Sequence, residues 1–282
     1  MRPADFDYSR PSTLADALQS TRQGALPLAG GQTLLPALRQ RELAPRALVD
    51  LACVSELSSE LHWLAESLAI GALVTHQTLA SDSRIGAELP WLAQAARQLG
   101  DVQVRNRGTT LGNVCWADPR ANMLVALGAS DAVVVVQDAV GALPRRLPIA
   151  DFVTGFRSTC LAGGIATALE LPLGPRRGIY LEFARQPQDL ALVNVCVVRG
   201  PGMARIVVGG VHDRPVRLAR LEALVATGDP RQPPPPATLA EALGELDLAT
   251  PADLHGSADY RRHLAVVLLQ RALAQLATEA DS

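Results

Sequence analysis

The sequence predicts an α+β protein with a two-lobed N-terminal domain, residues 1–175, and a C-terminal domain, residues 176–282. Three observations support this prediction. The first 55 residues read as strand, helix and strand; the pattern changes after Ser55; and a proline and glycine run, residues 172–175, precedes a hairpin followed by helices. A chain of 282 residues with 48% hydrophobic content is long enough to bury a sizeable core.

The first lobe, residues 1–55, is predicted to be a compact β-α-β unit behind a short N-terminal helix. Ser12 or Thr13 caps that helix, which runs to about Thr21. An apolar strand at residues 25–28 leads into a glycine pair. Helical spacing covers residues 34–41, a proline ends it, and residues 47–51 form a short buried strand.

The second lobe, residues 56–175, mixes strands with helices. Pro90 begins a helix that Gly100 ends, and another helix covers about residues 122–127. Strands are predicted at residues 68–71, 132–137 and 166–171. Between these elements lie residues 105–113, which we name the second segment.

The C-terminal domain is predicted to be an antiparallel hairpin with helices on one face. Strands at residues 190–198 and 204–208 flank a Gly-Pro-Gly turn, and residues 217–226 are amphipathic. A proline run, residues 233–236, favours a stiff extended connector. Helices are predicted to follow at residues 239–246 and 258–277.

Charge and composition argue against several functions. The formal net charge is -2 with both signs interspersed, so we expect no basic surface for nucleic acid or for an anionic membrane. All 26 basic residues are arginine, which excludes a Schiff-base lysine and a P-loop lysine. The chain starts without the apolar core of a signal peptide, and no apolar run is long enough to span a membrane. We therefore expect a cytoplasmic protein.

No catalytic residue and no metal site are predicted on this chain. The five histidines show no metal-ligand spacing, and no serine lies in a GxSxG context. The cysteines lie far apart without a CxxC pair, which favours isolated buried thiols over zinc or iron–sulfur ligands. These cysteines are Cys53, Cys115, Cys160 and Cys196.

Residues 29–33, which we name the glycine loop, are the first candidate binding site. A glycine pair between a strand and a helix lets the backbone approach a ligand closely, and the helix beyond it offers N–H groups to phosphate. Gln32 and Thr33 add side-chain donors. Such a pair is more often a structural turn than a ligand site, and the loop lacks the GxGxxG pattern of a Rossmann fold.

The second segment is the other candidate. Its two glycines, Gly108 and Gly112, allow tight backbone geometry, and its hydroxyl and amide side chains are able to bind phosphate or the edge of a flavin. A polar surface loop explains the same composition equally well.

Taken together and in this order, the two segments resemble the FAD-binding medium subunits of molybdenum hydroxylases, such as the carbon monoxide dehydrogenase and xanthine dehydrogenase flavoproteins. The resemblance covers nearly the whole chain. It extends over residues 6–11, 28–36, 48–51, 70–72, 105–113, 117–122, 152–157 and 257–262.

This resemblance implies a two-lobed FAD-binding domain of the vanillyl-alcohol-oxidase (PCMH) type and a C-terminal domain of the CO dehydrogenase flavoprotein type. The glycine loop would bind the pyrophosphate, residues 109–113 would reach the phosphates and flavin, and Tyr180 would stack on the isoalloxazine. Ala166 would lie beside the flavin, with Leu99 packed against the cofactor. The implied cofactor-binding residues are Leu28, Ala29, Gly30, Gly31, Gln32, Thr33, Leu99, Thr109, Thr110, Leu111, Gly112, Asn113, Asn122, Ala166, Tyr180 and Glu182.

Four positions depart from the family pattern. Leu111 replaces a glycine, which should hinder any positive φ or close approach there. Asn122 replaces an aspartate, and Gly164 replaces a glutamate. Glu182 replaces a lysine near the flavin, so we expect it to lower the flavin potential or to point elsewhere, with Arg185 as the hypothesised replacement cation.

By resemblance, the chain is expected to be the FAD-carrying electron-transfer subunit of a multi-subunit molybdenum hydroxylase. The 2Fe-2S clusters and the molybdenum cofactor would lie on a small iron–sulfur subunit and a large molybdopterin subunit, in a heterotrimer or a dimer of heterotrimers. Electrons would leave for NAD⁺, a quinone or oxygen. Two alternatives stay open: a flavin-deficient scaffold or assembly subunit, and a free-standing flavin oxidase of the same fold.

Overall fold

The structure is a computed structural model that describes residues 2–246 and 248–279. Met1 and residues 280–282, at the outer ends of the two expected domains, lie outside the described residues, as does Asp247. The first lobe holds a parallel three-stranded sheet in the order β1-β3-β2, with two helices. Its elements are β1 (Asp7–Ser9), α1 (Leu14–Arg22), β2 (Leu26–Leu28), α2 (Leu34–Gln40), β3 (Ala47–Asp50) and a 3-10 turn, η1 (Leu51–Cys53).

The predicted β-α-β unit of the first lobe is confirmed, and the predicted cap is Thr13. Its side-chain oxygen accepts a hydrogen bond from the backbone N–H of Asp16 at 3.2 Å, which satisfies one of the free donors at the start of α1. The sequence did not predict β1. This strand has three residues and pairs with β3 about forty positions away, so no local pattern marks it.

The second lobe is built on an antiparallel five-stranded sheet in the order β4-β5-β10-β6-β7. The last long strand of the lobe, β10, lies at its centre, where Leu169 pairs with Ile70 on one side and with Val134 on the other. All three side chains are fully buried. The strands are β4 (Leu61–Trp63), β5 (Ser67–Gly71), β6 (Val133–Gln137), β7 (Arg145–Pro148) and β10 (Ile165–Pro172).

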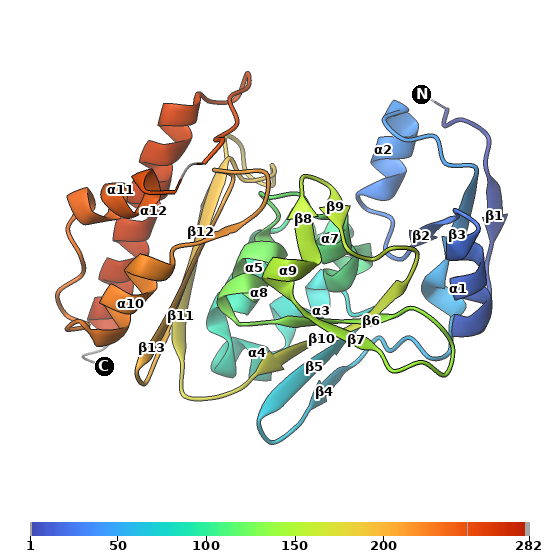
Figure 1. The fold of residues 1–282 in the computed structure, drawn as a ribbon, viewed down its shortest axis with the longest axis horizontal. Coiled ribbons are helices and arrows are strands. Elements are labelled where there is room, and N and C mark those ends of the chain that lie inside the picture. Colours follow the sequence, from blue (N-terminus) through green and yellow to red (C-terminus); the bar gives the residue numbers. More distant parts are fainter. Residues whose placement is uncertain (1, 247, 280–282) are drawn as a thin grey trace.

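This lobe also has seven helices, which lie to one side of that sheet in Figure 1, and a small hairpin. They are α3 (His76–Ser81), α4 (Ser83–Glu88), α5 (Pro90–Gln98), α6 (Val102–Arg107), α7 (Thr110–Trp116), α8 (Asn122–Ala129) and α9 (Ile149–Phe152), with the hairpin β8 (Val153–Gly155) and β9 (Ser158–Thr159).

Most of the second segment is helical, so it is not the polar surface loop that its composition also allowed. It contains the end of α6, a turn at Gly108 and Thr109, and the start of α7. Two capping side chains explain the helices. Asp101 accepts a hydrogen bond from Val104 N at 2.8 Å, and Thr109 accepts one from Gly112 N at 3.2 Å.

The C-terminal domain contains an antiparallel sheet in the order β11-β12-β13-β14. The predicted strands at residues 190–198 and 204–208 correspond to β12 and β13, but β11 was not predicted. The elements are β11 (Arg177–Phe183), β12 (Val193–Gly200), β13 (Met203–Gly209), β14 (Val216–Arg217), α10 (Ala219–Thr227), α11 (Pro236–Gly244) and α12 (Ala258–Glu279).

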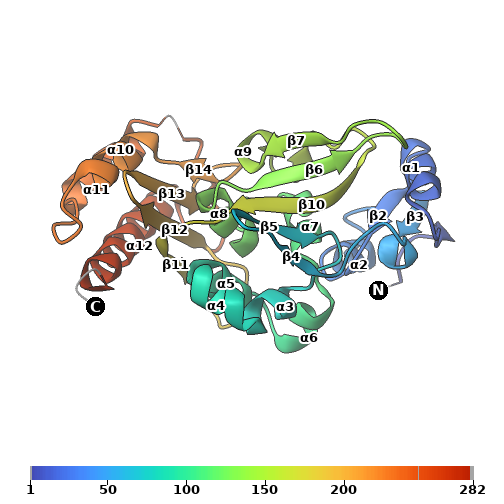
Figure 2. The ribbon, with the colours of Figure 1, turned by 90° about the horizontal axis from the view of Figure 1, so that it is seen from below.

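Helices cover both faces of this sheet, so the expectation of helices on one face was wrong (Figures 1 and 2). Alternate residues of β12 join different cores. Val195 and Val197 pack in a cluster with α10 and α12, whereas Cys196 and Val198 pack in a cluster with α5 and α8 of the second lobe. The sheet is therefore the shared wall between the two domains.

Charged groups also bind the domains together. Asp131, directly after α8, lies 2.6 Å from Arg205 Nε, 3.8 Å from Arg176 Nη1 and 3.9 Å from Arg217 Nη1. Three cations from the C-terminal half therefore face one carboxylate of the second lobe.

Candidate functional site

The glycine loop joins β2 to α2 and touches the second segment. Gly31 has a φ of +73°, a left-handed conformation that favours glycine. A Cβ added to Gly30 would lie 2.1 Å from the Arg107 carbonyl oxygen and 2.8 Å from Gly108 Cα. No side chain fits at Gly30, so the two segments meet through backbone.

The turn of the second segment is fixed to the start of α3. His76 N donates to the Gly108 carbonyl at 2.9 Å, and Thr110 N donates to the Val74 carbonyl at 2.9 Å. These two bonds flank an antiparallel bridge between Thr75 and Thr109. The backbone of the turn is thereby held against the glycine loop.

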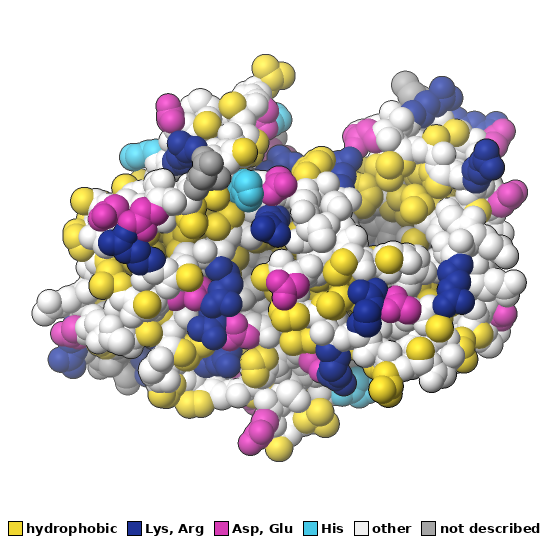
Figure 3. All heavy atoms as spheres, in the orientation of Figure 1, with side chains coloured by type: hydrophobic (Ala, Val, Ile, Leu, Met, Phe, Trp, Pro, Cys, Tyr) yellow, Lys and Arg dark blue, Asp and Glu magenta, His cyan; other side chains and the backbone are white. Residues whose placement is uncertain are grey.

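A cavity of about 440 Å³ lies between the two lobes, within the size range of small-molecule sites. In Figure 3 the face between α2 and the second lobe is hollowed, and hydrophobic side chains gather there. Most of the predicted cofactor-binding residues line this cavity: Leu28, Ala29, Gly30, Gly31, Gln32, Thr33, Leu99, Thr109, Leu111, Gly112, Asn113 and Ala166.

Polar atoms beside this cavity are buried without a partner among the described residues. They are Thr110 Oγ1, Asn113 Oδ1 and His76 Nδ1. Thr110 is fully buried beside its cavity-lining neighbours. Because a buried polar group without a hydrogen bond is costly, these atoms fit a polar ligand that would complete their bonding. These donor and acceptor atoms beside the glycine loop fit FAD.

Leu111 does not carry the strain that its place in a glycine position suggests. It lies inside α7, is not among the residues with positive φ, and is only 2% exposed. Gly164, the other unusual residue nearby, also lines the cavity. A Cβ there would lie 2.5 Å from Asp138 Oδ1, so the glutamate usual in the family would require the Asp138 side chain to move.

Sequence reasoning missed three polar or aromatic residues of the cavity wall: His76, Trp116 and Arg157. Burial, with a smaller effect from Arg105, lowers the pKa of His76 to about 4, so its imidazole is neutral at physiological pH. A single histidine after a strand carries no sequence signal for this role. Arg157 was marked only as part of the family-like stretch at residues 152–157.

Three of the predicted residues, Asn122, Tyr180 and Glu182, lie together at the boundary between the domains and not on the cavity wall. Asn122 Nδ2 donates to Glu182 Oε2 at 2.7 Å, and the Tyr180 hydroxyl donates to the same oxygen at 2.8 Å. Asn194 Nδ2 donates to the Tyr180 hydroxyl at 3.1 Å. Tyr180 is fully buried in this network.

Burial has a clear electrostatic effect on this network. It raises the pKa of Glu182 from 4.5 to about 6, although hydrogen bonds from Tyr180 and Asn122 favour the ionised form. Burial and the neighbouring Glu182 also raise the pKa of Tyr180 well above its usual value. The hypothesised cation, Arg185, has Nη1 2.8 Å from Nδ1 of His255.

Two family models together match most of the chain. Residues 4–174 match the family model described as the FAD binding domain in molybdopterin dehydrogenase. The chain belongs to this family. Residues 178–276 of the FAD subunit match a second model, the CO dehydrogenase flavoprotein C-terminal domain.

Relatives of the FAD subunit are named as medium chains or medium subunits of enzymes. The glyceraldehyde dehydrogenase medium chain of Sulfolobus acidocaldarius is 32% identical, over 98% of this chain and 100% of the relative. The nicotine 6-hydroxylase medium subunit of Paenarthrobacter nicotinovorans is 33% identical, over 95% of this chain and 96% of the relative.

Solved structures agree with the fold. A chain of quinoline 2-oxidoreductase from Pseudomonas putida 86 has a TM-score of 0.87 and 32% identity, and the match covers 99% of both chains. A chain of the Cu,Mo-CO dehydrogenase has a TM-score of 0.89 and 28% identity, again over 99% of both. The expected family, α+β fold class and oxidoreductase class are confirmed.

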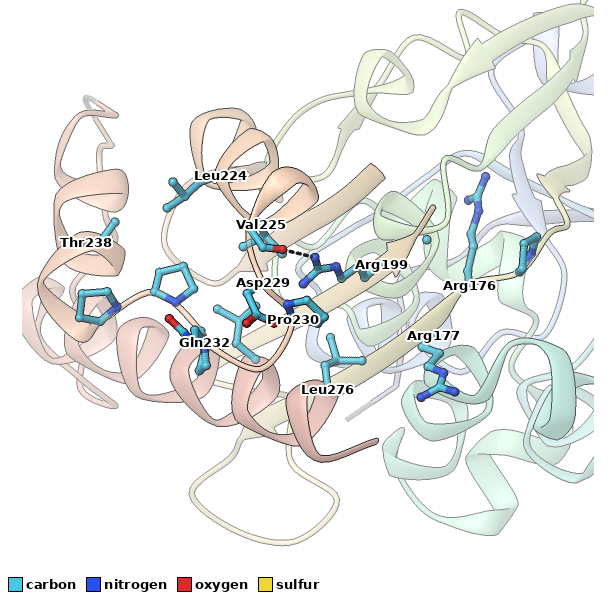
Figure 4. A pocket seen from close by; sticks show the side chains of 17 residues that line it. Arg176, Arg177, Arg199, Leu224, Val225, Asp229, Pro230, Gln232, Thr238 and Leu276 are labelled. Carbon is cyan, nitrogen blue, oxygen red and sulfur yellow. Dashed lines mark hydrogen bonds between the residues drawn. The ribbon is translucent and has the colours of Figure 1, made fainter. Parts of the chain in front are cut away.

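A larger cavity of about 860 Å³ lies in the C-terminal domain of the FAD subunit, and none of the predicted residues lines it. Its arginines do not converge on a ligand (Figure 4). Arg199 Nη2 donates to the Gly228 carbonyl at 2.6 Å, while Arg176 turns toward Asp131. Without convergent polar groups, this cavity does not resemble a cofactor site.

Other features of the FAD subunit concern metals and membranes. Within residues 2–246 and 248–279, no group of three or more His, Cys, Asp or Glu side chains could hold a metal ion. The four cysteines are free, but the expectation that all are buried was wrong: Cys53 is exposed and only Cys196 is fully enclosed. Among the described helices, none is long and apolar enough to cross a membrane.

Proposed function

We propose that FAD binds in the cavity between the lobes, with the glycine loop at the pyrophosphate and residues 109–113 at the phosphates and flavin. The observation that carries this proposal is the meeting of the two segments at Gly30, around a cavity flanked by buried polar atoms without partners. Leu99 and Ala166 line the same cavity and would pack against the cofactor.

Each part of the cavity wall has a distinct role in this proposal. Thr110 Oγ1 is able to donate a hydrogen bond, and Asn113 Oδ1 is able to accept one. The apolar side chains of Leu28 and Leu111 exclude water, which strengthens polar contacts made inside. Gly31 shapes the loop because its left-handed backbone is easiest for glycine.

We further propose that the chain transfers electrons within a molybdenum dehydrogenase complex. It would take them from iron–sulfur clusters of a small partner subunit and pass them to NAD⁺, a quinone or oxygen, while a large molybdopterin subunit oxidises the substrate. Bound FAD supplies the conversion between one-electron and two-electron transfer. A heterotrimer, or a dimer of heterotrimers, is the assembly consistent with this division of work.

Flavin contact by Tyr180, Glu182 and Asn122 stays a prediction. In the structure their polar groups bond to one another at the domain boundary. A flavin ring would stack on Tyr180 only if its edge reached that boundary and the network opened. These hydrogen bonds would hold β11, which carries Tyr180 and Glu182, against α8, which begins at Asn122.

The test of cofactor binding is the visible spectrum of the purified full chain after addition of FAD, with release of the cofactor on denaturation. We expect a yellow protein. Gly30→Ala should lose most bound FAD, because its Cβ would collide with the Arg107 carbonyl. The matched control is Gly174→Ala, where a Cβ meets nothing within 4 Å. A wild-type chain that stays colourless would contradict the proposal.

The test of electron transfer uses the chain co-purified with its two partner subunits. Reduction of the flavin absorbance by substrate should require both partners. Reduction by an organic substrate with the isolated chain would instead favour a free-standing oxidase.

A scaffold or assembly subunit without flavin is the second candidate. The observation that favours it is Leu111, whose side chain lines the cavity at a position where the family pattern has glycine. A scaffold would still assemble with the partner subunits but bind no FAD. Assembly together with a colourless chain therefore separates this candidate from the main proposal.

A further inference from the structure

We propose that Arg157 and Glu42 form a clasp that closes the two lobes over the cofactor cavity and slows the release of FAD. This inference rests on the proposed binding of FAD in that cavity. The clasp is an ion pair between the lobes at the edge of the cavity: Arg157 Nη1 donates to Glu42 Oε2 at 2.9 Å, and the two residues lie 115 positions apart in the chain.

The position of the clasp follows from two helices that begin at the cavity. The helix α2 starts directly after the glycine loop, and Glu42 lies two residues beyond its end. The helix α7 starts in the second segment and ends at Trp116. The two segments therefore meet at the N-terminal ends of these helices, while the clasp joins the lobes near their C-terminal ends. Leu43, Trp116 and Arg157 itself line the cavity there.

Arg157 is held rigidly in this position. Its backbone N–H donates to the Ala117 carbonyl, at the end of α7, at 2.9 Å. Its guanidinium carbon lies 4.6 Å from the centre of the Trp116 ring and 5.1 Å from that of Phe156. Stacking on Trp116 orients the cation toward Glu42 and fixes a long side chain that would otherwise lose entropy on pairing.

The backbone conformation of Arg157 also indicates that its side chain has a role. Its φ is +51°, in the left-handed region that non-glycine residues rarely adopt. A glycine would fit this turn of the β8–β9 hairpin without that cost, yet it would supply no side chain. Strain of this kind persists where the surroundings fix it and where the side chain has a role.

The clasp is weak enough to open. The side chains of Arg157 and Glu42 are 35% and 41% exposed, so water screens their attraction. A pair of this kind holds the lobes closed most of the time and still allows the cofactor to enter. Its effect should therefore be on the rate of FAD release more than on folding.

The test is the rate at which FAD leaves the loaded full chain, followed by flavin fluorescence in the presence of an excess flavin-binding apoprotein as a trap. Arg157→Met keeps the apolar stem and removes the charge. We expect it to speed release about tenfold, and Glu42→Gln about threefold, the range for an exposed ion pair with a cation–π contact. The double variant should be no faster than Arg157→Met.

A second arginine supplies a matched control. Arg84 stacks on Trp63 at 4.0 Å and pairs with Glu88 at 2.7 Å, but neither Arg84 nor Trp63 lines the cavity. Arg84→Met should leave FAD release unchanged while it perturbs stability as much as Arg157→Met does. Unfolding in urea, measured on all variants, separates a loss of closure from a loss of folding.

The outcomes distinguish the two proposals. If the wild-type chain binds no FAD, the proposed function fails. If it binds FAD and Arg157→Met releases it at the wild-type rate, or if the two single changes act independently and multiply in the double variant, the clasp is refuted and the binding site stands.

Discussion

At the scale of single residues, Asn122 and Glu182 are best understood as a pair. Both depart from the family pattern, and Asn122 Nδ2 donates to Glu182 Oε2 at 2.7 Å. An aspartate at position 122 would bring two carboxylates to hydrogen-bond distance in a buried place, which is unfavourable for both. The amide of Asn122 therefore suits the carboxylate of Glu182. The glutamate at position 182 accounts for the asparagine at position 122.

The raised pKa of Glu182 makes its contribution to stability depend on pH. The protonated carboxyl stabilises the fold fully below pH 4.5, and this stabilisation is lost as pH rises through the folded-state pKa of about 6. Glu182→Gln replaces the carboxyl group with an amide of the same shape that stays neutral at every pH. Above pH 6 we expect the variant to be more stable than wild type by about 2 kcal/mol, which corresponds to the shift in pKa.

The measurement is urea unfolding at several pH values. The two proteins should converge below pH 4.5, because wild-type Glu182 then becomes protonated in both the folded and unfolded states. A difference in stability that is the same at pH 4.5 and pH 7 would contradict the assigned ionisation. Tyr180→Phe, which removes one donor to the carboxylate, should raise the pKa of Glu182 further and widen the difference.

Sequence reasoning at this scale found the two segments that meet around the cavity. The glycine loop became a candidate only together with the second segment, because a glycine pair between a strand and a helix is more often a structural turn. His76 and Arg157 could not be predicted, because their roles arise from contacts with residues far along the chain. Tyr180 was expected at the flavin, but its burial depends on a sheet packing that no local pattern encodes.

At the scale of elements, α7 explains why Leu111 is tolerated. A residue inside a helix has negative φ, and leucine is a far better helix former than glycine. The side chain also joins the main hydrophobic core of the N-terminal domain. At this position leucine stabilises the helix that carries Thr110 and Asn113.

We therefore expect Leu111→Gly to destabilise the protein without improving FAD binding. The free energy of unfolding should fall by about 3 kcal/mol or more, from lost helix propensity and a new cavity. Leu224→Gly is the control, because Leu224 is also helical but 47% exposed. Leu224→Gly should lower the free energy of unfolding by about 1 kcal/mol, the cost in helix propensity alone. Tighter FAD binding by Leu111→Gly would instead favour the scaffold interpretation.

The elements that the sequence predicted are those with a complete local pattern. The helix from Pro90 has a proline start and a glycine stop, and it is observed one residue shorter than predicted. Strand β12 is buried on both faces, and its nearly continuous apolar run is typical of such packing, which the prediction of a sheet covered on one face did not take into account. The expectation of helices on one face failed for that reason.

At the scale of the whole molecule, Asp131 is the main ionic link between the domains. Its carboxylate faces Arg176, Arg205 and Arg217, whose side chains are 17%, 28% and 40% exposed. Asp131→Asn would remove the anion between Arg176 and Arg205, whereas Arg217 would keep its ion pair with Glu222 at 2.5 Å. We expect the free energy of unfolding to fall by about 2 kcal/mol, a partly exposed version of a broken buried ion pair.

Urea unfolding, together with limited proteolysis at the residue 172–175 connection, measures this effect. Glu88→Gln is the control, since it removes an exposed carboxylate that pairs with one arginine inside the second lobe. It should change stability little. An Asp131→Asn protein as stable as wild type, and equally resistant at the connection, would show that apolar packing alone holds the domains together.

The shared sheet has a consequence for how the protein is made. The residues that line the cavity between the lobes lie between Leu26 and Ala166, so the ribosome adds all of them before it adds β11, β12 and β13. Until those strands arrive, the faces of α5 and α8 that they cover are open to water. A chain that ends at residues 172–175 would contain every residue of the cavity wall and would leave these apolar faces of α5 and α8 uncovered. We therefore expect the C-terminal sheet to matter more for solubility than for the make-up of the cavity wall.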